Sequence, residues 1–222
     1  MVHVPAPARP TAGRLLTVTG VVQGVGFRPF VHRLAARHGL AGRVRNGSDG
    51  VRIHLEGHPD AMDAFAVELV GNPPFLARID GLTATDTVAE GLEEFTIETS
   101  AVDPVGRVPV SPDVAICDAC LAELADPADR RYRYPFITCT DCGPRFTLIE
   151  SMPYDRERTS MRAFPQCPAC SAEYRESGNR RYHSETNSCP ECGPRVWFEK
   201  DGKDGKDGND GSGAKDEVGS DD

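Results

Sequence analysis

The residues with the clearest chemistry are eight cysteines, all in the second half of the 222-residue chain and all in Cys-x2-Cys pairs. The pairs are Cys117 with Cys120, Cys139 with Cys142, Cys167 with Cys170, and Cys189 with Cys192. Each pair offers two thiolates, and two pairs supply the four sulfur ligands of a tetrahedral zinc site. Such a site keeps no open position for a catalytic water. The four pairs therefore predict two zinc ions with a structural role.

The spacing of the pairs reveals an internal repeat. Eighteen residues separate the first two pairs and again the last two, and the whole unit recurs with a period of 50 residues. The repeat favours zinc sites formed within each unit, although an interleaved pairing of first with fourth and second with third stays open. Redox disulfides and iron–sulfur ligation are the disfavoured alternatives. His183 is interpreted as a packing or hydrogen-bonding residue rather than a metal ligand, because thiolates already fill the sites.

A second candidate site is a glycine-rich segment between a strand pattern and a helix pattern. It reads Gly20, Val21, Val22, Gln23, Gly24, Val25, Gly26, Phe27 and Arg28. Glycines let backbone N–H groups turn toward one centre, and the start of the following helix also favours an anion. The Arg28 guanidinium adds donors that match a phosphoryl or carboxylate group. The segment predicts an anion cradle, and the alternative is an ordinary glycine-rich turn.

Asn46 is the residue that would complete this site. It ends a strand that the predicted topology is expected to set beside the first strand, so its side chain could face the cradle. An amide can hold and orient a water, while an oxygen of a bound phosphate accepts the proton. The alternative role is that of a turn residue before Gly47.

The elements that must position these residues follow from the hydrophobic periodicity of residues 13–100. We expect a strand at 14–19, a helix from Phe27 to Gly39, a hairpin of 40–45 and 51–56 around the turn 46–50, a helix from 59 to 71, and strands near 77–84 and 94–98. This order predicts an α+β, ferredoxin-like fold of the split βαβ type, with both helices on one face of an antiparallel sheet.

Composition divides the chain into zones. We predict a first domain at 13–100, a linker at 101–109, a double zinc-finger domain at 110–199 and a disordered, acidic tail rich in Gly, Asp and Lys at 200–222. The net charge is −9 and no segment is basic, which argues against a nucleic-acid partner. No apolar run reaches membrane-spanning length and no signal peptide is evident, so reduced cysteines in the cytoplasm are expected.

The two glycine-containing motifs resemble the paired signature of the acylphosphatase family. The matching residues are Gly20, Val22, Gln23, Gly24, Val25, Phe27 and Arg28, followed by Gly42, Val44, Asn46, Asp49 and Gly50. The resemblance implies that the loop from Gln23 to Arg28 and the Arg28 side chain bind phosphate, that Asn46 orients the attacking water, and that hydrolysis needs no metal or other cofactor.

Residues 27–35 and the four cysteine pairs together resemble the hydrogenase maturation carbamoyltransferase HypF family. The resemblance implies hydrolysis of carbamoyl phosphate in the first domain, with later ATP-dependent steps and a protein partner in nickel–iron hydrogenase maturation. Beyond residue 199 the chain shows no further nucleotide-binding pattern, so carbamoyl transfer is expected only if further domains are supplied.

These observations predict an acylphosphatase-type hydrolase acting on a small acyl phosphate, most specifically carbamoyl phosphate. The rival hypothesis is a non-enzymatic zinc-finger interaction module whose first domain is a phosphate-binding relic. The sequence leaves open the acyl substrate, the oligomeric state, and whether the chain is a fragment or stands alone.

Overall fold

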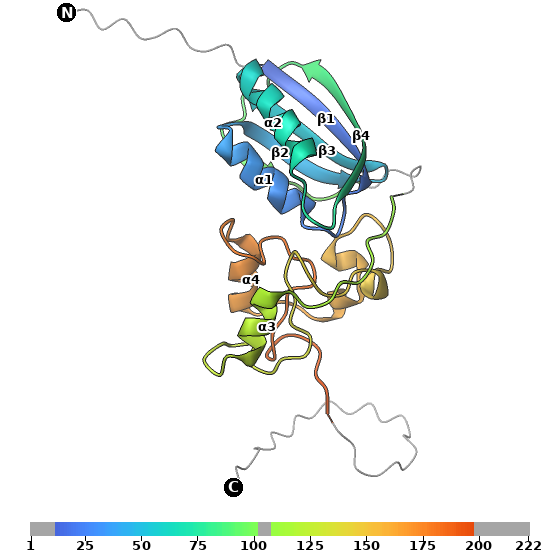
Figure 1. Ribbon diagram of the computed structural model, residues 1–222, viewed down its shortest axis with the longest axis vertical. Helices are drawn as coiled ribbons and strands as arrows, with labels where there is room; N and C mark the ends of the chain where they lie inside the picture. Colours follow the sequence, from blue (N-terminus) through green and yellow to red (C-terminus); the bar gives the residue numbers. More distant parts are fainter. Residues whose placement is uncertain (1–11, 102–107, 198–222) are drawn as a thin grey trace, which may run out of the picture.

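The structure is a computed structural model and describes residues 12–101 and 108–197. The predicted tail at 200–222 and most of the predicted linker lie outside the described residues. Figure 1 shows a sheet body, formed by residues 12–101, lying against a finger region formed by residues 108–197. In the described part of the chain, no helix combines the length and apolar character needed to cross a membrane.

The sheet body is a mixed α+β unit, as predicted. Its elements are β1 (Ala12–Val21), α1 (Phe27–Arg37), β2 (Ala41–Gly47), β3 (Gly50–Gly57), α2 (Pro59–Gly71), β4 (Arg78–Thr87) and β5 (Phe95–Ile97). The strand order is β4-β1-β3-β2-β5, and only the short β5 runs parallel to its neighbour. The expectation that β2 lies beside β1 is wrong, because β3 separates them. In addition, the hairpin turn is tighter than predicted, since Gly47 already pairs with Gly50.

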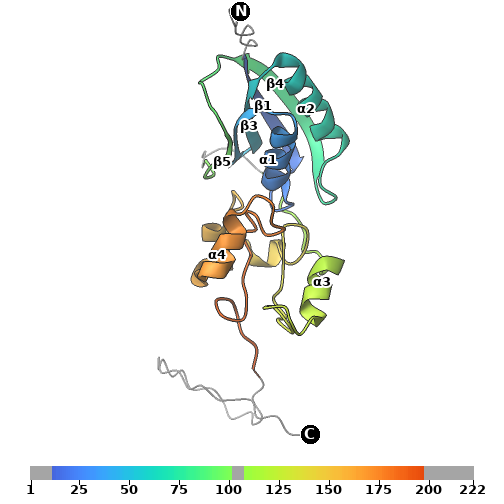
Figure 2. The ribbon, with the colours of Figure 1, turned by 90° about the vertical axis from the view of Figure 1, so that its left-hand side faces the viewer.

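The core lies between the sheet and the two helices, which cover the same face (Figure 2). Alternation along β1 sends Leu16 and Val18 inward, and both are fully buried. The helical spacing of Val31 and Leu34 on α1 places these side chains against the same layer. Burial of this continuous apolar layer stabilises the sheet body independently of the cysteines.

The opposite face of the sheet carries a buried carboxylate. Glu56 on β3 is only 2% exposed, because the segment between β4 and β5 crosses over it. Its oxygens accept hydrogen bonds from the backbone N–H groups of Glu90, Gly91 and Leu92 at 2.7–2.9 Å and contact His54 at 2.9 Å. Burial opposes the charge, but these donors outweigh it and lower the pKa of Glu56 from 4.5 to about 2. Glu56 therefore fixes the crossing segment.

The finger region contains little regular structure. Its helices are α3 (Asp118–Ala125) and α4 (Pro168–Arg175), with short 3-10 turns η1 (Phe146–Leu148), η2 (Arg156–Arg158) and η3 (Ser160–Ala163). The two α-helices begin 50 residues apart, and the equivalent residues Arg133 and His183 both adopt positive φ angles, 56° and 50°. The sequence repeat is therefore also a repeat of backbone structure.

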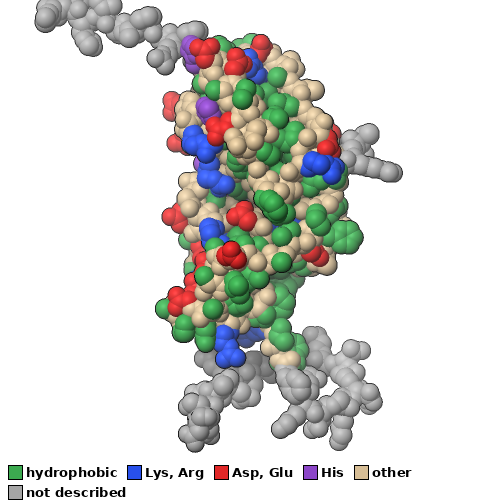
Figure 3. Space-filling view, viewed as in Figure 1, with side chains coloured by type: hydrophobic (Ala, Val, Ile, Leu, Met, Phe, Trp, Pro, Cys, Tyr) green, Lys and Arg blue, Asp and Glu red, His purple; other side chains and the backbone are tan. Residues whose placement is uncertain are grey.

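On the face shown in Figure 3, basic side chains lie in separate small groups among acidic and apolar ones.

The Glu56 site generates a stability prediction. We expect Glu56→Gln to lower the free energy of unfolding of the sheet body by about 2 kcal/mol at pH 7, because charged hydrogen bonds are lost. Since the pKa is lowered on folding, the stabilisation is present above the ordinary value of 4.5 and is lost as pH falls toward about 2. The deficit of the variant should therefore shrink between pH 5 and 2.

Methyl NMR signals of the sheet core would measure this unfolding separately from the fingers. Glu93→Gln, which changes an exposed carboxylate of the same segment, is the control and should shift stability by less than about 0.5 kcal/mol. Equal stability of Glu56→Gln and wild type at pH 7 would contradict the assigned role.

Candidate active site and metal centres

The predicted anion cradle connects β1 to α1 and is shaped by two glycines. Gly24 and Gly26 have φ angles of 73° and 71°, in the left-handed region that a side chain disfavours. Val25 and Phe27, between and after them, are buried in the core. This alternation anchors the loop by its side chains and leaves its backbone to line a cavity, in which α1 begins at Phe27.

Arg28 points out of the first turn of α1 and is 7% exposed. Its guanidinium donates to the Tyr154 carbonyl at 3.0 Å, to Asp155 Oδ1 at 3.0 Å and to Glu185 Oε1 at 2.9 Å. Burial by itself lowers the pKa of Arg28, but the charges of Glu185 and Asp155 more than compensate and raise it. Every partner of this arginine named here belongs to the finger region.

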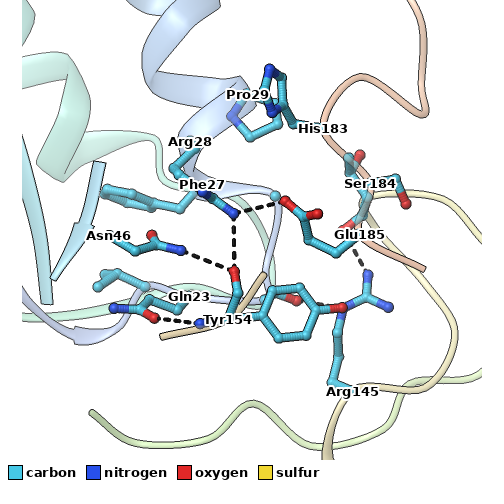
Figure 4. Close-up of a pocket in the computed structure, with 14 residues that line it drawn as sticks. Gln23, Phe27, Arg28, Pro29, Asn46, Arg145, Tyr154, His183, Ser184 and Glu185 are labelled. Carbon is cyan, nitrogen blue, oxygen red and sulfur yellow. Dashed lines mark hydrogen bonds and ion pairs between the residues drawn. The ribbon is translucent and has the colours of Figure 1, made fainter. Parts of the chain in front are cut away.

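Asn46 lies near the end of β2 and is 1% exposed. Its Nδ2 donates to the Tyr154 carbonyl at 3.1 Å, so one oxygen accepts from both Arg28 and Asn46 (Figure 4). The other amide atom, Oδ1, is buried without a hydrogen-bond partner among the described residues. The two residues that the sequence singled out are thus brought together, although β3 separates β2 from β1.

Gln23 explains how this happens. Its Nε2 donates to the carbonyls of Gly47 and Gly50 at 2.8 and 2.9 Å, which ties the glycine-rich loop to the end of the β2–β3 hairpin. Its Oε1 accepts from the Tyr154 backbone N–H at 3.1 Å. The Gln23 side chain therefore links the glycine-rich loop to the hairpin and to Tyr154. An anion could contact only the backbone of this residue without breaking these bonds.

The sequence missed the contribution of the finger region to this site. Arg145 donates from Nε to the Gly24 carbonyl at 2.5 Å, and Tyr154, His183, Ser184 and Glu185 line the same cavity. The signal that could have found part of this set is a break in the repeat. His183, Ser184 and Glu185 replace the tripeptide 133–135 of the first unit, Arg-Tyr-Pro.

His183 contacts two aromatic rings, those of Tyr174 and Tyr182, with ring centroids 4.7 Å away in each case. Burial, together with the charge of Arg28, lowers the pKa of His183 to about 4, so the ring is neutral at pH 7. It does not belong to either cysteine cluster among the described residues. Its predicted packing role agrees with this position.

The eight cysteines form two clusters, and both are local. Each contains the ligand atoms of four cysteines within 4.8 Å of one another, Cys117, Cys120, Cys139 and Cys142 in the first and Cys167, Cys170, Cys189 and Cys192 in the second. The grouping within each repeat unit is the one that the spacing favoured. None of the cysteines is in a disulfide.

The sulfur geometry fits zinc. A tetrahedron with Zn–S bonds of about 2.3 Å has edges of about 3.8 Å. The Sγ–Sγ distances are 3.8 Å for Cys117–Cys139 and Cys139–Cys142, and 3.6–3.8 Å in the second cluster. Two closed four-thiolate clusters of this kind are consistent with structural zinc and would leave no position for a reacting water.

Arginines that the two units exchange contact the sulfur atoms of the clusters. Arg130 of the first unit approaches Cys170 Sγ of the second at 2.7 Å, and Arg180 of the second unit approaches Cys120 Sγ of the first at 3.2 Å. Cationic donors stabilise metal-bound thiolates. Each cluster is therefore completed by the other repeat unit.

The neighbouring arginines repeat this exchange with carboxylates. Arg131 forms an ion pair with Glu173 on α4, and Arg181 forms the equivalent pair with Glu123 on α3. Arg131 and Arg181 are almost fully buried, at 1% and 4% exposure. The finger region is thus one interlocked unit rather than two separable fingers.

The fold and the site define an acylphosphatase-type domain joined to a pair of four-cysteine fingers. The acylphosphatase family model matches residues 15–97, and the HypF finger model matches residues 116–149 and 167–199. An acylphosphatase of Thermotoga petrophila is 43% identical over 84 residues, which are 37% of this chain and 92% of that protein.

Both parts occur together in known proteins. Carbamoyltransferase HypF2 of Cupriavidus necator is 48% identical over 165 residues, covering 72% of this chain and 20% of the relative. A crystal structure of full-length HypF in the phosphate- and nucleotide-bound form matches with a TM-score of 0.82 at 44% identity, covering 88% of this chain and 27% of that one. Over residues 15–97 the chain belongs to the acylphosphatase family, and over most of its described length it matches the acylphosphatase-plus-finger part of HypF proteins, about a fifth of the length of the curated carbamoyltransferases.

The cluster geometry predicts the result of metal removal. We expect about two zinc ions per chain by elemental analysis, and chelation should unfold the finger region while the sheet body, which has its own apolar core, stays folded. Circular dichroism and methyl NMR before and after chelation would show this. One zinc ion or none per chain in protein purified without chelator, or an iron–sulfur absorption spectrum, would disprove the assignment.

Because each arginine contacts a cysteine of the other repeat unit, we expect its removal to affect the cluster of that other unit. Arg130→Ala should speed metal loss from the second cluster about 10- to 100-fold, and Arg180→Ala should do the same to the first, since each removes a donor from the other unit's thiolates. Cadmium-113 NMR of the substituted protein distinguishes the clusters. The two variants serve as each other's controls, and metal loss from the variant's own unit alone would contradict the exchange.

Proposed function

We propose that this chain hydrolyses an acyl phosphate, carbamoyl phosphate in particular, to phosphate and the corresponding carboxylate or carbamate. The observation that carries the proposal is the single carbonyl oxygen of Tyr154, which accepts from Arg28 at 3.0 Å and from Asn46 at 3.1 Å. A phosphoryl oxygen at this point would be held by both side chains. The membership of residues 15–97 in the acylphosphatase family supports this interpretation.

In the proposed reaction, Arg28 and the backbone N–H groups from Gln23 to Arg28 bind the phosphoryl group and neutralise its charge. Asn46 Oδ1, which is buried and unpartnered among the described residues, accepts a hydrogen bond from the attacking water. The water oxygen bonds to phosphorus, the bond between phosphorus and the acyl oxygen breaks, and the carbamate leaves with that electron pair. The water proton passes to a phosphoryl oxygen.

The zinc ions have no place in this reaction. The eight cysteines would hold them, and when bound they supply folding free energy to the finger region. Because thiolate ligation requires reduced cysteines, we propose that the protein works in the cytoplasm.

The relatives suggest a wider context. Proteins named carbamoyltransferase HypF match this chain over about a fifth of their length, and one solved HypF structure is described as phosphate- and nucleotide-bound. We propose that the chain acts as the acyl phosphate-hydrolysing part of a HypF-type carbamoyltransferase in nickel–iron hydrogenase maturation, with a protein partner of that process. Transfer of the carbamoyl group would then require the remaining parts of such a protein.

A non-enzymatic interaction module remains the rival, and one observation favours it: Arg28 is already paired with Asp155 and Glu185. Turnover separates the two hypotheses. Release of phosphate from carbamoyl phosphate or benzoyl phosphate by the purified chain, without ATP, supports the hydrolase, and no release above the spontaneous rate supports the rival.

Two substitutions test the assigned roles. Arg28→Ala should abolish turnover and weaken phosphate binding, because the guanidinium that would pair with the phosphoryl group is lost. Asn46→Ala should lower kcat about 100-fold with little change in phosphate affinity, because the attacking water loses its partner whereas Arg28 and the loop N–H groups still bind the phosphoryl group. Arg28→Lys, which keeps the charge but not the planar donor pair, should fall between wild type and Arg28→Ala.

Steady-state kinetics and calorimetric titration with inorganic phosphate would measure both effects, with zinc content as a check on folding. If Asn46→Ala weakened phosphate binding and left kcat intact, the role of Asn46 in orienting water would be wrong.

A further inference from the structure

The cradle is occupied by a piece of the chain itself. The backbone of Tyr154 is held at both ends, its N–H by Gln23 at 3.1 Å and its carbonyl by Arg28 and Asn46 at 3.0 and 3.1 Å. Arg28 and Asn46 are the side chains that would hold a phosphoryl oxygen in the proposed reaction. We call residues 154–156 the strap. The strap therefore uses the donors that a substrate needs.

The ion pairs of Arg28 also indicate that the site is occupied by the chain itself. Arg28 is paired with Asp155 of the strap and with Glu185, whose side chain is 4% exposed. Glu185 also fixes the strap directly, because its Oε2 accepts from the Arg156 backbone N–H at 3.2 Å. A phosphoryl dianion placed beside both carboxylates would be repelled. Substrate and carboxylates therefore compete for one guanidinium.

The volume of the cavity at the glycine-rich loop leads to the same conclusion. The cavity at the glycine-rich loop has a volume of about 20 Å³, which is enough for about one water molecule and too small for a phosphate. A second cavity, of about 250 Å³, lies on the other side of Arg28, His183 and Glu185, which line both cavities. Glu185 and Arg28 thus stand between the roomy outer cavity and the loop.

The repeat shows that this arrangement is particular to the second unit. Residues 183–185 and 133–135 occupy equivalent positions, and His183 and Arg133 share the same unusual backbone conformation. The first unit has Pro135 where the second has Glu185, so it carries no carboxylate there. The backbone of the repeat does not require an acid at this point, and the acid is present only in the unit that faces Arg28.

We infer that the strap and Glu185 act as an internal pseudosubstrate, which closes the phosphate seat of the free protein and which an acyl phosphate must displace in order to bind. The inference rests on the proposed function in taking this seat as the phosphate site. Tyr154 provides the oxygen, and Glu185 provides the negative charge. The finger region thereby controls access to the sheet body's site.

Amide hydrogen exchange in the wild-type chain tests displacement directly, with inorganic phosphate as the probe. The N–H groups of Tyr154 and Arg156 are bonded to Gln23 and Glu185 only while the site is closed. We expect saturating phosphate to speed exchange at these two amides about tenfold or more and to slow it at residues 24–28. Slower exchange at the strap as well as the loop would show a lid that stays in place, and would overturn the inference.

A substitution at Glu185 provides the second test of the inference. Glu185→Gln should bind inorganic phosphate about tenfold more tightly than wild type and should show faster strap exchange before phosphate is added, because the closed state is less favoured. Glu157→Gln is the matched control, since it removes the same charge from an exposed residue lining the same outer cavity. Equal tightening in both variants would reduce the effect to general electrostatics and overturn the inference.

The two arms are independent of turnover. If phosphate displaces the strap and no variant hydrolyses an acyl phosphate, the proposed function fails and the pseudosubstrate stands. If wild type hydrolyses carbamoyl phosphate and Glu185→Gln changes neither phosphate affinity nor KM, the hydrolase stands and the pseudosubstrate fails. Absence of phosphate binding in both wild type and Glu185→Gln also overturns the inference.

Discussion

A guanidinium that is almost fully buried must have an anion beside it, and much of this molecule is arranged around that requirement at Arg28. The cost of an unpaired buried charge is several kcal/mol, which is comparable to the stability of a small domain. The glycine-rich loop and α1 hold Arg28 at the edge of the sheet body, and the finger region brings Asp155 and Glu185 to it. The contact between the two parts is therefore electrostatic at its centre. The same charge that would bind a substrate also binds the protein's own carboxylates.

The finger region also depends on contacts between arginines and negatively charged groups. Its apolar clusters are small and consist largely of the cysteines themselves, so burial of apolar side chains contributes little to the stability of the finger region. Four thiolates around zinc carry a net negative charge, and arginines from the opposite unit lie against them. In both parts of the molecule, an arginine of one unit is matched by negative groups of another. These pairs help to fix the relative positions of the units.

The sequence predicted the parts of this structure that depend on local patterns. The α+β order of the sheet body and both of its helices follow from periodicity, and the structure confirms them. The spacing favoured the local cysteine grouping but left an interleaved pairing open, and the structure shows the local one. The position of β2 could not be derived in the same way, because strand order depends on how hairpins fold back rather than on alternation. Asn46 nonetheless reaches Arg28, since the side chain of Gln23 links the hairpin to the loop. The roles of Arg28 and Asn46 in catalysis stay predictions.

The contribution of the finger region to the site could not be predicted from the sequence, for reasons that differ between residues. Tyr154 acts through its backbone, which any residue type would provide. Arg145 has a counterpart in Arg195, yet the first is buried against the glycine-rich loop and the second is exposed. Identical residues in a repeat thus have different roles once one copy faces another domain. The acid at Glu185 is the exception, because it interrupts the repeat and could have been singled out.

The separation of Arg28 from Glu185 along the chain also has a consequence for biosynthesis. The two residues are 157 positions apart, a stretch that a ribosome adding about 5–20 residues per second needs roughly 8 to 30 seconds to make. The sheet body emerges first and has its own core, so it can fold before its counter-charge exists. During that interval the proposed phosphate site of the nascent chain would be open, because Tyr154 and Glu185 would not yet have been added. Closure comes only when the second repeat unit has emerged and its cysteines have been brought together.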